Sequence, residues 1–93
     1  MKYMPYEPTP DQYKWLHALY SGMVTLWKYR EDEELRTDMH KKFSDYATTL
    51  DNLGVPWHIQ NMVAAAGEKK ENWDRYNRAV LNEVFGKCFV GAN

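Results

Sequence analysis

The 93-residue chain has little of what most catalytic and metal sites require. Its three histidines, His17, His40 and His58, show no metal-ligand spacing such as His-x-x-x-His, and no glycine-rich phosphate loop is present. No apolar run approaches the ~20 residues of a membrane helix, and Met1–Pro5 lacks the apolar core of a signal peptide. We therefore expect a protein without metal or cofactor, outside the membrane and in the cytoplasm.

Cysteine is almost absent as well. Cys88 is the only one, so no internal disulfide can form, which suits a reducing compartment. It lies in a predicted tail between Lys87 and Phe89, away from a helix start that would lower its pKa.

Motifs typical of hydrolases are missing as well: the sequence contains no G-x-S-x-G motif and no pair of carboxylates in apolar surroundings. We expect a surface or half-buried bystander thiol and no enzyme activity.

Net charge is small, and aromatic residues are abundant. The formal charge is -1, so no strong field draws the chain to nucleic acid or acidic lipid. Four Trp, seven Tyr and three Phe make up 15% of the residues. Aromatic side chains fill cores and also anchor protein interfaces. The functional question is which of them exceed the needs of the core.

The clearest break in the chain is the elbow Leu53–Trp57. Gly54 is suited to the left-handed conformation that closes a helix, and Pro56 is suited to the first position of the next. Before the elbow, an extended arm (1–9) leads into a helix predicted for 10–29. Thr9, Pro10 and Gln12 form its capping signal. Apolar residues then recur at spacings of three and four: Leu16, Leu19, Tyr20, Met23, Leu26 and Trp27.

A second helix is predicted for 33–53. The apolar phase shifts by about two residues near Arg30–Asp32, close to 200° of helix rotation, which indicates a tight turn with Asp32 as N-cap. Glu33 and Glu34 then lie in the first turn, where the helix dipole favours acids. Gly22, between Leu19 and Leu26 of the first helix, is suited to a close crossing by another helix.

A third helix is predicted for 57–85, because Ile59, Ala66, Trp73 and Val80 keep one phase across Gly67. The alternative is a bend or break there, with helices at 57–66 and 69–85. The tail is 87–93, and no run of alternating apolar residues predicts a strand. We expect one all-α domain, 1–93: an antiparallel bundle of three helices, or four if the third is broken.

Several aromatics lie off the apolar stripes. Tyr13, Trp15 and Tyr29 do so on the first helix, and Trp57 and His58 lie at the elbow. These five residues are the predicted partner-binding surface, since Trp and Tyr are favoured interface anchors. The leading hypothesis is a non-enzymatic protein that binds another protein, with inhibition of that partner as one form of the hypothesis. The other use of the same aromatics is a homodimer that completes the bundle across a two-fold axis. Short, aromatic-rich chains of this kind are typical of bacteriophage accessory proteins.

The alternative hypothesis is a nucleotide or small-ligand site at a subunit interface. Trp73–Arg78 mixes aromatics with arginines, a combination that can stack on and clamp nucleotides. The site would comprise Lys28, Arg75, Tyr76 and Arg78. Against it, Tyr76 lies on the predicted apolar stripe, and the two arginines lie on a solvated face.

Overall fold

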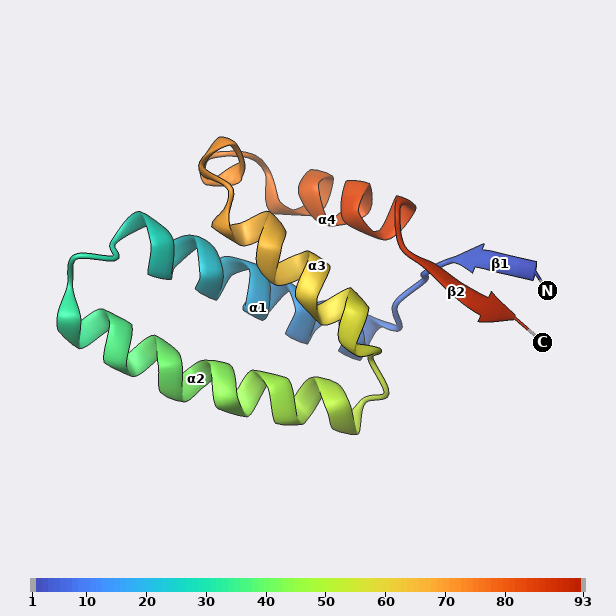
Figure 1. Cartoon of the computed structure of the whole chain (residues 1–93), viewed down its shortest axis with the longest axis horizontal. Coiled ribbons are helices and arrows are strands. Elements are labelled where there is room, and N and C mark those ends of the chain that lie inside the picture. The colour runs from blue at the N-terminus through green and yellow to red at the C-terminus, as the bar shows by residue number, and fades with distance from the viewer. Residues whose placement is uncertain (1, 93) are drawn as a thin grey trace.

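The computed structural model describes residues 2–92, which form a bundle of four α-helices with antiparallel packing contacts (Figure 1). Its elements are β1 (Lys2–Pro5), α1 (Pro10–Lys28), α2 (Glu33–Asn52), α3 (Trp57–Glu68), the single-turn 3₁₀ helix η1 (Lys70–Asn72), α4 (Asn77–Gly86) and β2 (Phe89–Ala92). The predicted all-α bundle is confirmed, in its four-helix form. In this described range, every helix is too short or too polar to cross a membrane.

The predicted start of α1 and the turn before α2 are both confirmed. Thr9 Oγ1 accepts a hydrogen bond from the Gln12 backbone N–H at 3.2 Å, and Gln12 Oε1 accepts one from the Thr9 N–H at 3.0 Å. Asp32 caps α2 by accepting from the Leu35 N–H at 3.1 Å. Gly22 lies where α1 and α2 approach closely, because a Cβ built on it would be 2.8 Å from the Phe43 ring.

The elbow between α2 and α3 turns at Gly54, whose φ is +80°. Pro56 occupies the N-cap of α3, so Trp57 is the first helical residue. The Gln12 side chain donates to the Leu53 carbonyl oxygen at 2.8 Å, which fastens the elbow to the start of α1. This bond places the elbow at the N-terminal end of α1.

The continuous helix predicted for 57–85 is wrong, and the alternative with a break is closer to the structure. The helix stops at Glu68 rather than at Gly67, and α4 begins only at Asn77. Two side chains from the following loop bond the last carbonyls of α3: Asn72 Nδ2 donates to Ala66 O, and Trp73 Nε1 donates to Gly67 O, each at 3.0 Å. These bonds replace the backbone partners that a longer helix would supply.

Gly67 is a packing position within α3, not the point where the helix breaks. A Cβ there would lie 2.7 Å from Met23 Cβ and 2.9 Å from the Tyr20 carbonyl oxygen. The residue therefore lets α3 cross α1 with almost no space between them. The apolar spacing that continues across Gly67 therefore does not indicate one continuous helix. The same spacing predicted Tyr76 to lie in the core, and Tyr76 is 73% exposed.

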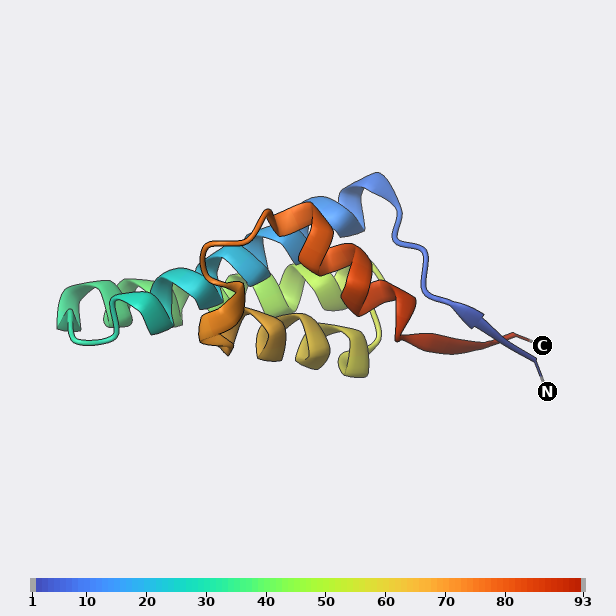
Figure 2. The same ribbon diagram turned by 90° about the horizontal axis from the view of Figure 1, so that it is seen from above.

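The core lies between α1, α3 and α4, with the elbow end of α2 at its side (Figure 2). Its largest fully buried side chains are Tyr20, Leu16, Leu50, Ile59, Leu81, Val63, Val80 and Cys88. Burial of Cys88 contradicts the predicted surface or half-buried thiol: Sγ lies 3.3 Å from Met62 Sδ, and burial raises the pKa of the thiol. Its position fits a small apolar side chain.

The two ends of the chain pair as an antiparallel ribbon, which the sequence did not predict. Lys2 lies opposite Ala92 and Pro5 opposite Phe89. The Tyr6 N–H extends this pairing by donating to the Cys88 carbonyl oxygen at 2.8 Å. Strands of four residues are too short for an alternating pattern to show. Their pairing depends on the helices bringing the two ends together.

Candidate ligand-binding cleft

The five predicted partner-binding residues do not form one surface. Tyr29 (55% exposed) lies just beyond the C-terminal end of α1, whereas Trp57 (63% exposed) and His58 lie at the elbow beside its N-terminal end. The two ends of this 19-residue helix are about 27 Å apart at 1.5 Å per residue. Trp15 is half-buried, with its ring centroid 6.0 Å from that of Tyr46 on α2, and Tyr13 faces α4.

A cleft of about 510 Å³ opens between α1 and the start of α4. Its lining contains three of the four residues predicted for the alternative ligand site. The full lining is Tyr13, Lys14 and His17 from α1, with Arg75, Tyr76, Asn77 and Arg78 from the loop and the first turn of α4. Residues far apart in the sequence thus converge on a single concave surface.

Direct contacts join the two walls of the cleft. Asn77 Nδ2 lies 3.2 Å from His17 Nε2 and 3.3 Å from Ser21 Oγ. The Arg78 guanidinium carbon lies 5.9 Å from the Tyr13 ring centroid, within the range of a cation–π interaction. The packing of α4 on α1 therefore sets the width of the cleft.

The charge of the lining is of one sign. Lys14 and Arg78 are exposed cations, and none of the seven lining residues is an acid. The first turn of α4 contains no acidic residue, and no side chain within the described range caps it. The N–H groups of Asn77 and Arg78 thus add the positive end of a helix dipole. The cleft is suited to an anionic group.

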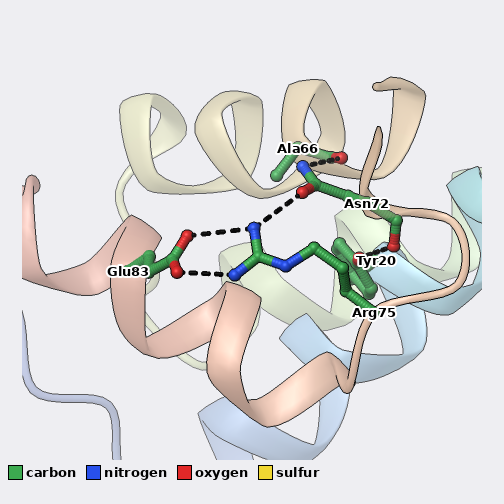
Figure 3. Close-up of polar contacts among 5 residues, drawn as sticks. All are labelled: Tyr20, Ala66, Asn72, Arg75 and Glu83. Carbon is green, nitrogen blue, oxygen red and sulfur yellow. Dashed lines mark hydrogen bonds and ion pairs between the residues drawn. The ribbon is translucent and has the colours of Figure 1, made fainter. Parts of the chain in front are cut away.

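Arg75 acts mainly as a brace rather than as a free cation (Figure 3). Its Nη2 donates to Glu83 Oε1 at 2.6 Å, and its Nη1 donates to Glu83 Oε2 at 3.3 Å and to Asn72 Oδ1 at 3.1 Å. The guanidinium lowers the pKa of the Glu83 carboxyl. The Tyr20 hydroxyl holds the same loop by donating to the Asn72 carbonyl oxygen at 2.8 Å. This network fixes the loop that presents Tyr76 to the cleft.

Lys28 is separate from this site. Its Nζ lies 3.1 Å from Asp74 Oδ1 in an exposed ion pair, and its side chain lines a different depression, formed with residues 29–32. The bond to Asp74 raises the pKa of the lysine. Of the residues predicted for the ligand site, the structure thus groups Arg75, Tyr76 and Arg78 and leaves Lys28 out.

Sequence reasoning missed Lys14, His17 and Asn77. Tyr13 and His17 are four residues apart and therefore share a helix face, and Lys14 is beside them; this spacing was the available signal. This face of α1 meets the start of α4 only because α3 ends at Glu68. The spacing of apolar residues in the sequence did not reveal that end.

Residues 2–92 contain no group of three or more His, Cys, Asp or Glu side chains that could hold a metal ion. Comparison of the chain with protein-family models, curated proteins and solved structures finds no match.

Proposed function

We propose that the protein binds a small ligand of the nucleotide class, an anionic group joined to a planar ring, in the cleft between α1 and α4. The observation that carries this proposal is the convergence of cations and tyrosines on one concave surface that no acid lines. Its volume, about 510 Å³, lies within the roughly 300–1,000 Å³ of small-molecule sites.

Each part of such a ligand has a counterpart in the cleft. Lys14, Arg78 and the open N–H groups at the start of α4 would bind the anionic group, since charge-assisted bonds and a helix N-terminus both favour phosphate. Tyr76, which is 73% exposed, offers a ring face on which a base can stack. Tyr13 forms the opposite side and is already held by Arg78.

Binding without catalysis fits this chemistry best. The cleft holds donors and ring faces, and its lining includes no cysteine, serine or carboxylate as a nucleophile. His17 is suited to general-base chemistry, but its Nε2 lies 3.2 Å from Asn77 Nδ2 and is already engaged there. With the chain's overall charge of -1, the positive surface is local, which favours a small ligand over a nucleic-acid strand.

Isothermal titration with AMP, ATP, adenosine and inorganic phosphate tests the proposal, with thermal unfolding as a second readout. AMP or ATP should bind more tightly than adenosine or phosphate alone, because only the nucleotides satisfy both parts of the cleft. A nucleotide at ten times its Kd should add about 1.4 kcal/mol to the free energy of unfolding. For a domain of this size, that shift corresponds to roughly 6 to 11 °C in Tm.

Variants separate the cleft from general charge effects. Arg78→Gln should weaken nucleotide and phosphate binding, whereas Tyr76→Ala should weaken nucleotide binding and leave phosphate unaffected. Lys41→Gln, an exposed charge on α2 outside the cleft lining, is the matched control. The proposal fails if no nucleotide binds, or if Lys41→Gln weakens binding as much as Arg78→Gln.

Protein binding through exposed aromatics is a second proposal, supported by Trp57 at 63% exposure beside the exposed His58. Trp57→Ala should abolish capture of a partner protein and leave Tm almost unchanged. Trp15→Ala should instead lower Tm, because that ring packs against Tyr46. Capture that survives Trp57→Ala would remove the elbow from this proposal.

A further inference from the structure

The α1–α2 hairpin projects beyond the rest of the bundle. Gly67 of α3 packs against Tyr20 and Val24, and α3 ends one residue later at Glu68. The last turn of α1 and the first turns of α2 extend past that point, as the left side of both ribbon views shows (Figures 1 and 2). At this end, α1 and α2 lie side by side without α3, which packs along the remainder of α1.

An apolar depression of about 480 Å³ lies on this projecting end. Leu26 is half-buried, and Trp27 is 39% exposed. The charged and polar residues around them are Arg30, Glu31, Arg36 and His40. These six residues are called the hairpin-end surface below. Trp27 was expected on the core face of α1, and its exposure here leaves a large aromatic ring without a full set of apolar neighbours.

The charges of the hairpin-end surface select its occupant. Arg30 and Arg36 are cations, Glu31 is an anion, and Glu33 lies 3.8 Å from Arg36 in a loose ion pair that can exchange partners. A uniformly acidic partner would meet Glu31 and, just outside the surface, Glu33, and a uniformly basic one would meet the two arginines. A second copy of this chain offers each sign its counterpart, as a two-fold contact requires.

We propose that two copies of the chain associate through their hairpin-end surfaces about a two-fold axis, so that two α1–α2 hairpins complete a four-helix arrangement. Leu26 and Trp27 form the centre of the contact, and Arg36 pairs with Glu31 of the other copy. The chain's net charge of -1 produces little repulsion between copies. The contact leaves the α1–α4 cleft open and does not depend on ligand binding.

The small size of the surface predicts a weak and reversible dimer. Two helix ends offer less than the ~800 Å² per partner of a standard interface, so we take a Kd on the order of tens of micromolar as the range to test. Sedimentation equilibrium over protein concentrations from about 2 to 500 μM therefore spans the transition. Wild-type protein should pass from monomer to dimer within this range.

Two variants place the contact. Trp27→Glu should raise the dimer Kd at least about tenfold, because it puts a charge at the centre of the interface. Trp57→Glu is the matched control: Trp57 is more exposed, at 63%, and lies at the other end of the molecule, so its Kd should not change. Circular dichroism and Tm confirm that each variant is folded.

A charge exchange provides a test that does not rely on Trp27. Arg36, whose side chain is 45% exposed, tolerates substitution without loss of core packing. Arg36→Glu should weaken the dimer, and Glu31→Arg added to it should restore the wild-type Kd. The proposal is overturned if wild-type protein stays monomeric at the highest concentration, if the added Glu31→Arg gives no rescue, or if Trp57→Glu dissociates the dimer and Trp27→Glu does not.

Discussion

Gly67→Ala should destabilise the protein, although alanine is the better helix former. A Cβ at this position would lie 2.7 Å from Met23 Cβ and 2.9 Å from the Tyr20 carbonyl oxygen. Carbon atoms normally pack at ~3.5–4.0 Å, so the first distance is about 1 Å too short. Neither neighbour is the free end of a flexible side chain, and α3 must therefore move away from α1.

The magnitude follows from two opposing terms. Replacing helical Gly by Ala gains up to ~1 kcal/mol of helix propensity. Overpacking a well-filled contact costs about 1–3 kcal/mol, and the immobility of both neighbours places this site at the upper end of that range. We expect a net loss of about 1–2 kcal/mol in the free energy of unfolding, or roughly 5 to 15 °C in Tm.

Urea titration followed by circular dichroism measures this loss, with Gly86→Ala as the matched control. Gly86 is also helical, and a Cβ built on it meets nothing within 4 Å. Gly86→Ala should therefore leave stability unchanged or raise it slightly. If Gly67→Ala proves as stable as the parent, the close crossing of α1 and α3 is wrong, and a bend point in a longer helix becomes the better account of Gly67.

Three further outcomes are expected. Tyr20→Phe removes the donor to the buried Asn72 carbonyl and should cost about 1–3 kcal/mol in urea titrations; no loss would contradict that bond. Iodoacetamide should modify Cys88 far more slowly in native than in denatured protein, since burial raises the pKa of the thiol; equal rates would contradict its burial. Arg75 lowers the pKa of Glu83, so the stability from this pair is present above the unfolded pKa of the carboxyl and is lost as pH falls through its lower folded pKa. Glu83→Gln should slightly reduce stability at neutral pH and flatten that part of the pH profile measured by urea titration; an unchanged profile would contradict the pairing.

Local signals in the sequence predicted the first half of the fold well. The capping box at Thr9, the N-cap Asp32 and the turn at Gly54 each act within a few residues, so composition and spacing reveal them. The shift in apolar phase near Arg30–Asp32 also corresponds to a real turn. These features depend on residues that are close in the sequence and not on tertiary contacts.

The second half depends on contacts that sequence spacing does not encode. The end of α3 is fixed by Asn72 and Trp73, which reach back to its last carbonyls, and by Tyr20, which is 52 residues from its partner Asn72. The seven-residue spacing of Ile59, Ala66, Trp73 and Val80 continues across this break by coincidence and therefore falsely indicates one helix. The terminal ribbon escaped prediction for the same reason, since each strand is defined only by the other.

The candidate site shows the same division. Arg75, Tyr76 and Arg78 were identified by their residue types, because arginines beside aromatics suit anionic, ring-bearing ligands. Lys14 and His17 could be recognised only after the break before α4 placed that helix start opposite them. Lys28 was grouped with the site by charge alone, and in the structure it pairs with Asp74 instead.

Ligand binding in the α1–α4 cleft can be followed residue by residue by titrating ¹⁵N-labelled protein with AMP and recording the backbone amide signals. If AMP binds there, saturable shifts are expected in both walls of the cleft, at Tyr13, Lys14 and His17 and at residues 76–79. The open N–H groups of Asn77 and Arg78 should be among the most affected. Absence of any shift, or shifts confined to the elbow or to the hairpin-end surface, would contradict binding in the cleft.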